Sequence, residues 1–123
     1  MPDMDTSALK EIGLTDGEVK VYLALLRLGE TTSGPLVEES EVSVSKVYLI
    51  LERLAKKGLA SHIVKRDTKY FKAADPNRLL MYMTEKEEQL MSQESKLKEL
   101  IPTLQLQNQT AFTGETAQVY QGM

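Results

Sequence analysis

The side chains that could carry catalytic or metal chemistry are few in this chain. His62 is the only histidine among 123 residues, and there is no cysteine. A Ser/His/Asp arrangement would have to be built around His62, and neither a thiolate zinc site nor a histidine cluster can form. His62 falls in a predicted strand, where a solvent-facing or satisfied histidine is the simpler interpretation. We therefore predict that the chain is not an enzyme and uses no metal or cofactor.

Basic side chains, in contrast, are concentrated in the middle of the chain. The net charge is −3 overall. Residues 46–72 carry eight basic and two acidic side chains, a net charge of +6, whereas residues 1–45 have a net charge of −6 and residues 73–123 one of −3. This asymmetry favours a polyanion-binding surface over chance clustering on a solvated face.

Helical segments lead into the basic block. Thr15 and Glu18 form a capping box that begins a helix, which Gly29 ends. The residues expected on its buried face recur at helical spacing, namely Val19, Tyr22, Leu23 and Leu26. A cap at residues 31–33 precedes a short helix over residues 36–40, and a longer helix follows over residues 44–57. This order is the outline of a helix-turn-helix.

The helix over residues 44–57 is predicted to be a recognition helix with two distinct sides. Six residues are expected to face the core: Val44, Val47, Tyr48, Leu51, Leu54 and Ala55. The other side is expected to face DNA, with Ser43 at its start: Ser45, Lys46, Leu49, Arg53 and Lys56, with Lys57 beyond them. Ser45, Lys46 and Leu49 are suited to base edges and thymine methyl groups in a major groove, whereas the later cations neutralise phosphates. A packing role for Leu49 is the alternative.

A β-hairpin is predicted directly after this helix, with strands over residues 59–64 and 69–73. Its tip carries Lys65, Arg66 and Lys69, which are expected to contact the DNA backbone or minor groove; ordinary solvation of the turn is the alternative. Ser33 is a second candidate for an anion contact, with simple capping as the alternative. The combination predicts a winged helix-turn-helix over residues 1–74, a mainly α fold with a small hairpin.

A long helix is predicted over residues 75–108. Its apolar residues lie at heptad-like positions: Leu79, Met83, Leu90, Leu97, Leu100 and Leu104. We expect this segment to pair two protomers into a homodimer; the alternative is that it packs on its own domain. Pro102 is expected to kink or end the helix near Leu100. Residues 109–123 form a polar tail with one isolated strand predicted over residues 117–120.

Three runs in the chain resemble the TrmB-like family of transcriptional regulators: Leu14 to Leu26, Ser45 to Leu59, and Tyr70 to Pro76. The resemblance covers residues 9–80 closely and the following helix to about residue 105 loosely. It implies a mostly archaeal, dimeric transcription factor that binds a palindrome-like operator in double-stranded DNA. Val44 departs from the family pattern, which often has proline at the start of the recognition helix.

The resemblance also bears on effectors, since members of the family often carry a C-terminal sugar-sensing domain. Residues 109–123 look like the start of such a domain, so the chain is either a truncated piece or a short member. A sugar effector is implied only where that domain exists.

Two functions remain open from the sequence: a sequence-specific DNA-binding regulator, or a winged-helix module that binds proteins within a larger complex. The basic block favours the first. No run of about 18 apolar residues is present, so we expect a cytoplasmic protein with no membrane contact.

Overall fold

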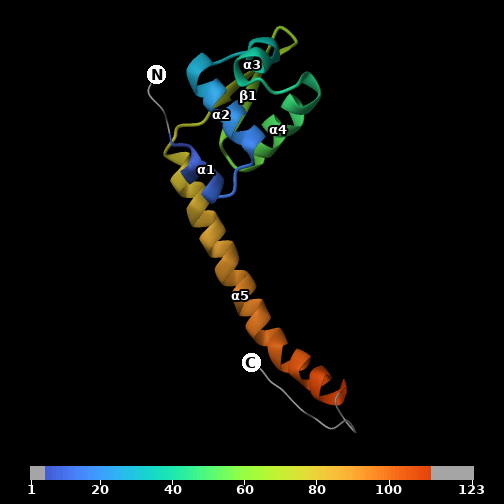
Figure 1. The fold of residues 1–123 in the computed structure, drawn as a ribbon. Helices are drawn as coiled ribbons and strands as arrows, with labels where there is room; N and C mark the ends of the chain where they lie inside the picture. The colour runs from blue at the N-terminus through green and yellow to red at the C-terminus, as the bar shows by residue number, and fades with distance from the viewer. Residues whose placement is uncertain (1–4, 112–123) are drawn as a thin grey trace. The chain divides into compact units, whose positions relative to one another are not determined.

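The structure is a computed structural model that describes residues 5–111 (Figure 1). Seven elements follow one another along the chain: α1 (Ser7–Glu11), α2 (Asp16–Leu28), α3 (Ser33–Ser40), α4 (Val44–Lys56), β1 (Ala60–Lys65), β2 (Thr68–Ala73) and α5 (Arg78–Ala111). The chain divides into two compact units, one ending at Thr84 and the other beginning at Glu85. The predicted fold class, mainly helical with one hairpin and a long C-terminal helix, is confirmed.

Helix α2 is the centre of the first unit. The predicted capping box is present, because the Glu18 amide donates to Thr15 Oγ1 at 3.1 Å and the Thr15 amide donates to Glu18 Oε1 at 2.9 Å. The predicted buried face includes one exposed residue and omits several buried ones. Leu26 is 42% exposed, whereas Leu25 is fully buried. The reason is that α2 contacts α1, α3, α4 and β2, so it is covered on several sides.

The core lies between α2, α3, α4 and the hairpin. Its largest fully buried apolar side chains are Tyr22, Leu25, Leu36, Leu54 and Leu59, together with Val21 and Val47. Gly17 leaves room for the Ile50 side chain where α2 meets α4, because an added Cβ would lie 2.8 Å from Ile50 Cδ1. The hydrophobic core therefore fixes α4 against α2.

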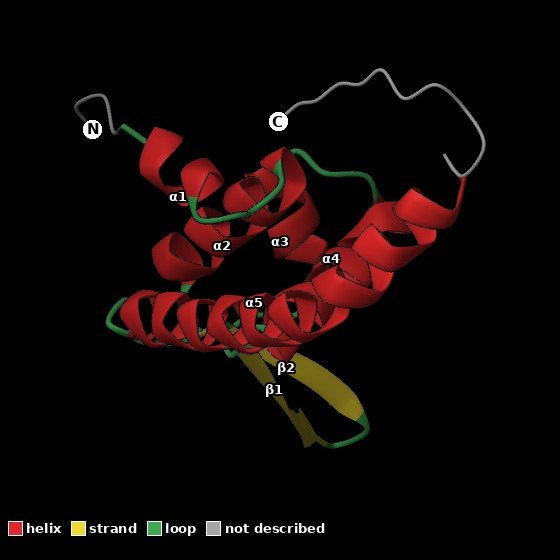
Figure 2. Ribbon diagram, turned by 90° about the horizontal axis from the view of Figure 1, so that it is seen from below, coloured by secondary structure: helices red, strands yellow, loops and turns green. Residues whose placement is uncertain are grey.

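The two strands form one antiparallel hairpin, drawn in yellow in Figure 2. Their register runs from Ala60 opposite Ala73 to Lys65 opposite Thr68. The connection is a two-residue turn in which Arg66 and Asp67 both have positive φ, 51° and 65°. These angles are those of a type I′ turn, which matches the twist of the strands.

Thr31 forms an isolated antiparallel bridge with Phe71 of β2, which the sequence did not indicate. Its amide donates to the Phe71 carbonyl at 2.9 Å, and the Phe71 amide donates to the Thr31 carbonyl at 2.6 Å. Of the residues 31–33 predicted to supply the cap, Thr32 occupies the N-cap of α3, but it makes no side-chain cap hydrogen bond. The bridge ties β2 to the segment that leads into α3.

Helix α5 begins at Arg78, slightly later than predicted, and continues through Pro102 to Ala111. Pro102 was expected to kink or end the helix; it does not end it, and Figure 1 shows the helix bending in its orange-red part. Proline removes one helical hydrogen bond, and here the residues around it are exposed, so water can satisfy the freed carbonyl. The strand predicted over residues 117–120 lies outside the described residues. Within residues 5–111, no helix combines the length and apolar character needed to cross a membrane.

Candidate nucleic-acid interface

One side of α4 is exposed and carries the residues predicted to face DNA. Ser45, Lys46, Arg53 and Lys56 are all exposed, and Leu49 leaves 49% of its surface in contact with solvent. Leu49 is therefore not a core residue in this chain. Ser43 occupies the N-cap position, yet its hydroxyl lies 3.1 Å from the Ser45 hydroxyl and does not cap the helix.

The buried side of α4 differs from the prediction at three positions. Val44, Tyr48 and Ala55 were expected in the core, but all three are exposed. Ile50 is buried in their place, beside Val47, Leu51 and Leu54. The packing against α2 thus turns α4 about its axis relative to the arrangement expected from hydrophobicity alone.

Tyr48 instead connects two elements at the surface. Its side chain is 52% exposed, and its hydroxyl donates to Ser33 Oγ at 2.9 Å. Its ring meets the Phe71 ring edge-on, with 6.2 Å between the centroids. Ser33, the predicted anion contact at the start of α3, therefore has an intramolecular partner.

The cations of the hairpin tip are exposed, but they differ in their partners. Lys65 Nζ lies 2.6 Å from Glu30 Oε2 and 5.2 Å from the centroid of the Tyr70 ring. The hydrogen bond and the charge of Glu30 raise the pKa of Lys65. Arg66 and Lys69 form no ion pair within residues 5–111.

Lys57 was expected to neutralise phosphate, but in the structure it forms an ion pair within the chain. Its Nζ lies 2.6 Å from Glu18 Oε2, and its side chain is only 21% exposed. The Glu18 carboxylate is buried, so it serves both the capping box and this ion pair. The pair joins the end of α4 to the start of α2, a connection over 39 positions that local patterns do not reveal.

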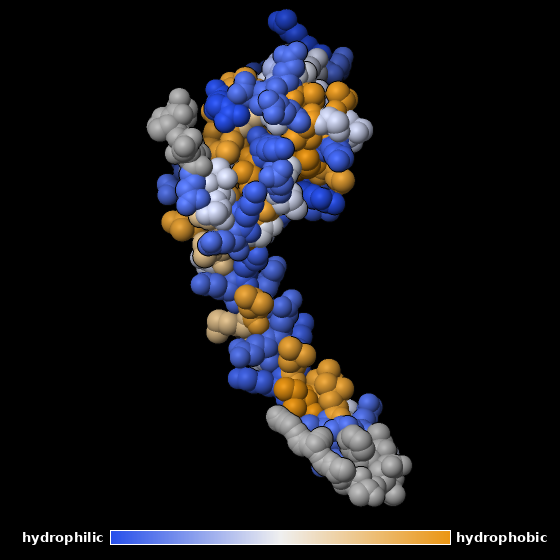
Figure 3. Space-filling model, in the orientation of Figure 1, coloured by the Kyte–Doolittle hydropathy of each residue, from blue (hydrophilic) through white to orange (hydrophobic). Residues whose placement is uncertain are grey.

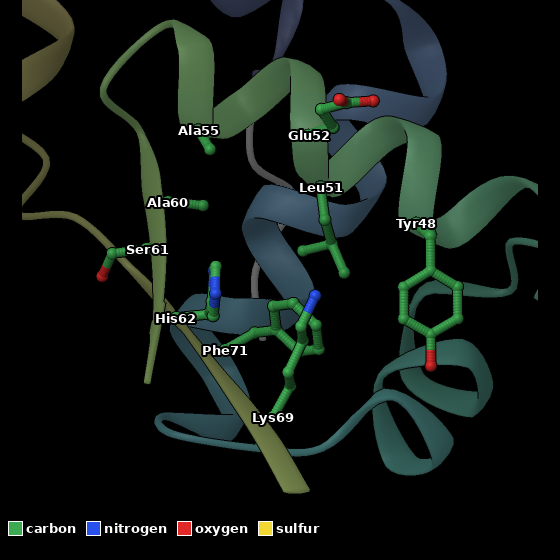
Figure 4. A pocket seen from close by; sticks show the side chains of 9 residues that line it. All are labelled: Tyr48, Leu51, Glu52, Ala55, Ala60, Ser61, His62, Lys69 and Phe71. Carbon is green, nitrogen blue, oxygen red and sulfur yellow. The ribbon is translucent and has the colours of Figure 1, made fainter. Parts of the chain in front are cut away.

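A groove of about 390 Å³ separates α4 from the hairpin (Figure 4). Tyr48, Leu51 and Glu52 line it from α4. His62 lines it from β1 and Lys69 from β2, and Phe71 lies between the two sides in Figure 4. His62 is exposed, as expected, and it also lies in this concave surface.

Apolar side chains are also exposed on α5. Five of the six residues predicted for dimerisation are between 41% and 62% exposed: Met83, Leu90, Leu97, Leu100 and Leu104. Leu79 differs, because it is half-buried against the core of the first unit. Figure 3 shows orange, apolar side chains among polar ones on the second unit. Ile101 was missed, although it lies five helical turns after Met83 and hence on the same face.

Among the described residues, no group of three or more histidine, cysteine, aspartate or glutamate side chains is arranged to hold a metal ion. The features that stand out are therefore the exposed side of α4, the cations of the hairpin and the groove between them. A model of the family described as "Sugar-specific transcriptional regulator TrmB" matches residues 9–77, more than half of the chain. The chain belongs to the TrmB family.

The matched region contains α2, α3, α4 and both strands, so the whole candidate interface lies within the TrmB-family part of the chain. The resemblance seen in the sequence is confirmed. The match ends before α5.

Solved structures share this fold. TrmBL2, described as an archaeal chromatin protein with a novel mode of DNA binding, is 26% identical with a TM-score of 0.73; the alignment covers 94% of this chain and 47% of that one. The chain thus spans about half the length of TrmBL2. No curated protein matches the chain.

Two more distant structures show the fold alone. A MarR-family regulator from Silicibacter pomeroyi is 17% identical with a TM-score of 0.53, covering 93% of this chain and 82% of that one. A possible regulator from Methanosarcina mazei Go1 is 15% identical with a TM-score of 0.59, covering 78% and 88%.

Proposed function

We propose that this TrmB-family chain is a sequence-specific DNA-binding transcriptional regulator whose helix α4 enters the major groove. The observation that carries the proposal is the exposed side of α4, which combines hydroxyl, cationic and aliphatic side chains next to a cationic hairpin. An aliphatic residue between cations has no packing role there, but it can contact a thymine methyl group.

The positions of these side chains along α4 suggest a division of roles. Ser45 and Lys46 lie in the first turn, the part of a recognition helix that contacts base edges. Leu49 follows one turn later on the same side. Arg53 and Lys56, in the last turns, are suited to phosphates on the flanking backbone.

The hairpin supplies further phosphate contacts in this proposal. Arg66 and Lys69 are available, whereas Lys65 has to exchange its carboxylate partner Glu30 for a phosphate. The Ser33 and Ser43 hydroxyls are polar contacts at the starts of α3 and α4. The acidic remainder of the chain disfavours contact with DNA through any other surface.

A homodimer would present two such helices to an operator with two half-sites. The exposed seam of α5, from Met83 to Leu104 with Ile101 added, is the proposed dimer contact, and Leu79 is left to packing in the first unit. Half-sites would lie about 34 Å apart, one turn of DNA. Because chromosomal DNA is the partner, we place the protein in the cytoplasm; a sugar effector would require a further sensing domain.

Binding to duplex DNA at several salt concentrations tests the proposal. A preferred sequence is first selected from a random duplex pool. The logarithm of the association constant should fall by about 0.9 per neutralised phosphate for each tenfold rise in salt. The selected duplex should also bind tighter than random DNA at every salt concentration. A flat salt dependence without sequence preference would favour a protein-binding module instead.

A further inference from the structure

The groove between α4 and the hairpin lies between the two elements that the proposed function assigns to DNA, and the inference below rests on that function. In B-form DNA the major and minor grooves are separated by a sugar-phosphate strand. A protein with α4 in the major groove and its hairpin tip in the adjacent minor groove must therefore have this strand pass between the two elements. The groove of about 390 Å³ is the concave surface at that position.

The floor and walls of the groove are suited to a sugar-phosphate strand. Phe71 is buried and is flanked by two aromatic rings, with His62 6.0 Å and Tyr48 6.2 Å away between centroids. This apolar floor can pack against deoxyribose. In Figure 4 the Lys69 side chain extends across the Phe71 ring toward Leu51 of α4, and His62 lines the same groove from β1. Phosphate binding requires cations or hydrogen-bond donors, and the groove offers both here.

His62 and Lys69 differ from Lys57 and Lys65, whose side chains are paired with carboxylates. Lys57 is held by Glu18, and Lys65 by Glu30. Among residues 5–111, the side chains of His62 and Lys69 form no hydrogen bond or ion pair. Both are exposed, so each can meet an anion without breaking an existing contact.

We propose that this groove binds one backbone strand of the operator, with Lys69 contacting phosphate at every pH and His62 contacting it only as the imidazolium.

The groups that face His62 determine the sign of the pH effect. The ionisable groups that line the groove with it are Glu52 and Tyr48 from α4 and Lys69 from β2. Figure 4 shows the Glu52 carboxylate directed away from His62 and Lys69. A phosphate would be the nearest anion in the complex, and it favours the protonated ring. The bound state then takes up a proton, so affinity increases as the pH falls through the range in which histidine titrates.

The experiment measures duplex affinity and its salt slope at about pH 5.5 and about pH 8, the two ends of the histidine range. The wild-type chain should bind roughly three- to tenfold tighter at the lower pH, where the imidazolium adds one charge-assisted contact to the phosphate. The salt slope should also be steeper there by up to about 0.9. In His62→Gln, neither the affinity nor the salt slope should depend on pH in this way.

Lys69→Gln should lower the salt slope by about 0.9 at both pH values while keeping the pH effect. Lys72→Gln is the matched control, because alternation along β2 places Lys72 on the opposite face from Lys69; it should leave both the salt slope and the pH effect unchanged. Thermal unfolding of each variant checks that the exposed substitutions leave the fold unchanged.

The outcomes separate this inference from the proposed function. If the wild-type chain binds DNA with a steep salt slope but His62→Gln keeps the same pH dependence, or Lys69→Gln keeps the same slope, the groove does not bind the backbone. If the wild-type chain shows no salt-dependent DNA binding at all, the proposed function itself fails.

Discussion

The Tyr48 hydroxyl donates a hydrogen bond to Ser33 Oγ at 2.9 Å, which joins the exposed side of α4 to the first turn of α3. Because Tyr48 is the donor, the Ser33 hydroxyl keeps its own proton for an external acceptor. Two hydroxyls in series also polarise each other. Tyr48 is thus a positioning residue for Ser33 in the proposed interface.

Tyr48→Phe should weaken binding to every duplex about two- to tenfold, the range of about 0.5–1.5 kcal/mol for one hydrogen bond. Ser33→Ala should have a similar effect, and the double variant should be no weaker than either single variant. Fluorescence anisotropy with random and selected duplexes measures all three. The ring remains in Tyr48→Phe, so its thermal unfolding should match that of the wild-type chain. Additive losses would show that the two hydroxyls act independently.

The buried ion pair between Lys57 and Glu18 should contribute to stability rather than to DNA binding. Lys57→Met keeps the aliphatic stem but leaves the Glu18 carboxylate buried without its cation. We expect a loss of about 2–3 kcal/mol in the free energy of unfolding, measured in urea. Lys56→Met is the matched control, because Lys56 is exposed and its loss should cost no more than about 0.5 kcal/mol. Equal losses would contradict a structural role for Lys57.

Glu30 should restrain the cation of Lys65. Glu30→Gln removes the carboxylate 2.6 Å from Lys65 Nζ, so every duplex should bind a few-fold tighter at low salt, with the gain vanishing as salt screens it. Glu39→Gln is the control: it removes the same charge from an equally exposed pair, with Arg27 at 2.7 Å, away from the hairpin. If both variants gain equally, the effect comes from net charge and not from release of Lys65.

The seam on α5 should hold two protomers together. Leu90→Glu combined with Leu97→Glu places two carboxylates on this exposed stripe, so sedimentation should show monomers at concentrations where the wild-type chain is a dimer. Leu106→Glu changes an equally exposed leucine on the opposite side of the helix and should leave the dimer intact. An unchanged mass for the double variant would place the interface elsewhere.

Local sequence signals proved sufficient for the elements themselves. Two signals, the capping box at Thr15 and Glu18 and the strand pattern over residues 59–64, depend on residues within a few positions of each other. The exposed cations of α4 were also predicted, because charged side chains avoid the core.

Contacts between segments that are distant in the sequence could not be predicted from these local patterns. The bridge from Thr31 to Phe71 and the ion pair from Lys57 to Glu18 join residues about 40 positions apart, and they exist only once the helices have packed. Tyr48 was misplaced for a related reason. A phenol is apolar enough to fill a core position, yet it is equally stable at the surface when its hydroxyl has a partner.

The specificity ratio, the affinity for a selected operator divided by that for random DNA, tests most directly whether α4 reads base sequence. Lys46→Ala should lower this ratio about tenfold or more, as expected for loss of a contact to a base edge. Lys56→Ala should weaken binding to both duplexes equally and leave the ratio unchanged. A Lys46→Ala chain that keeps the wild-type ratio, at equal salt, would contradict the placement of α4 in the major groove.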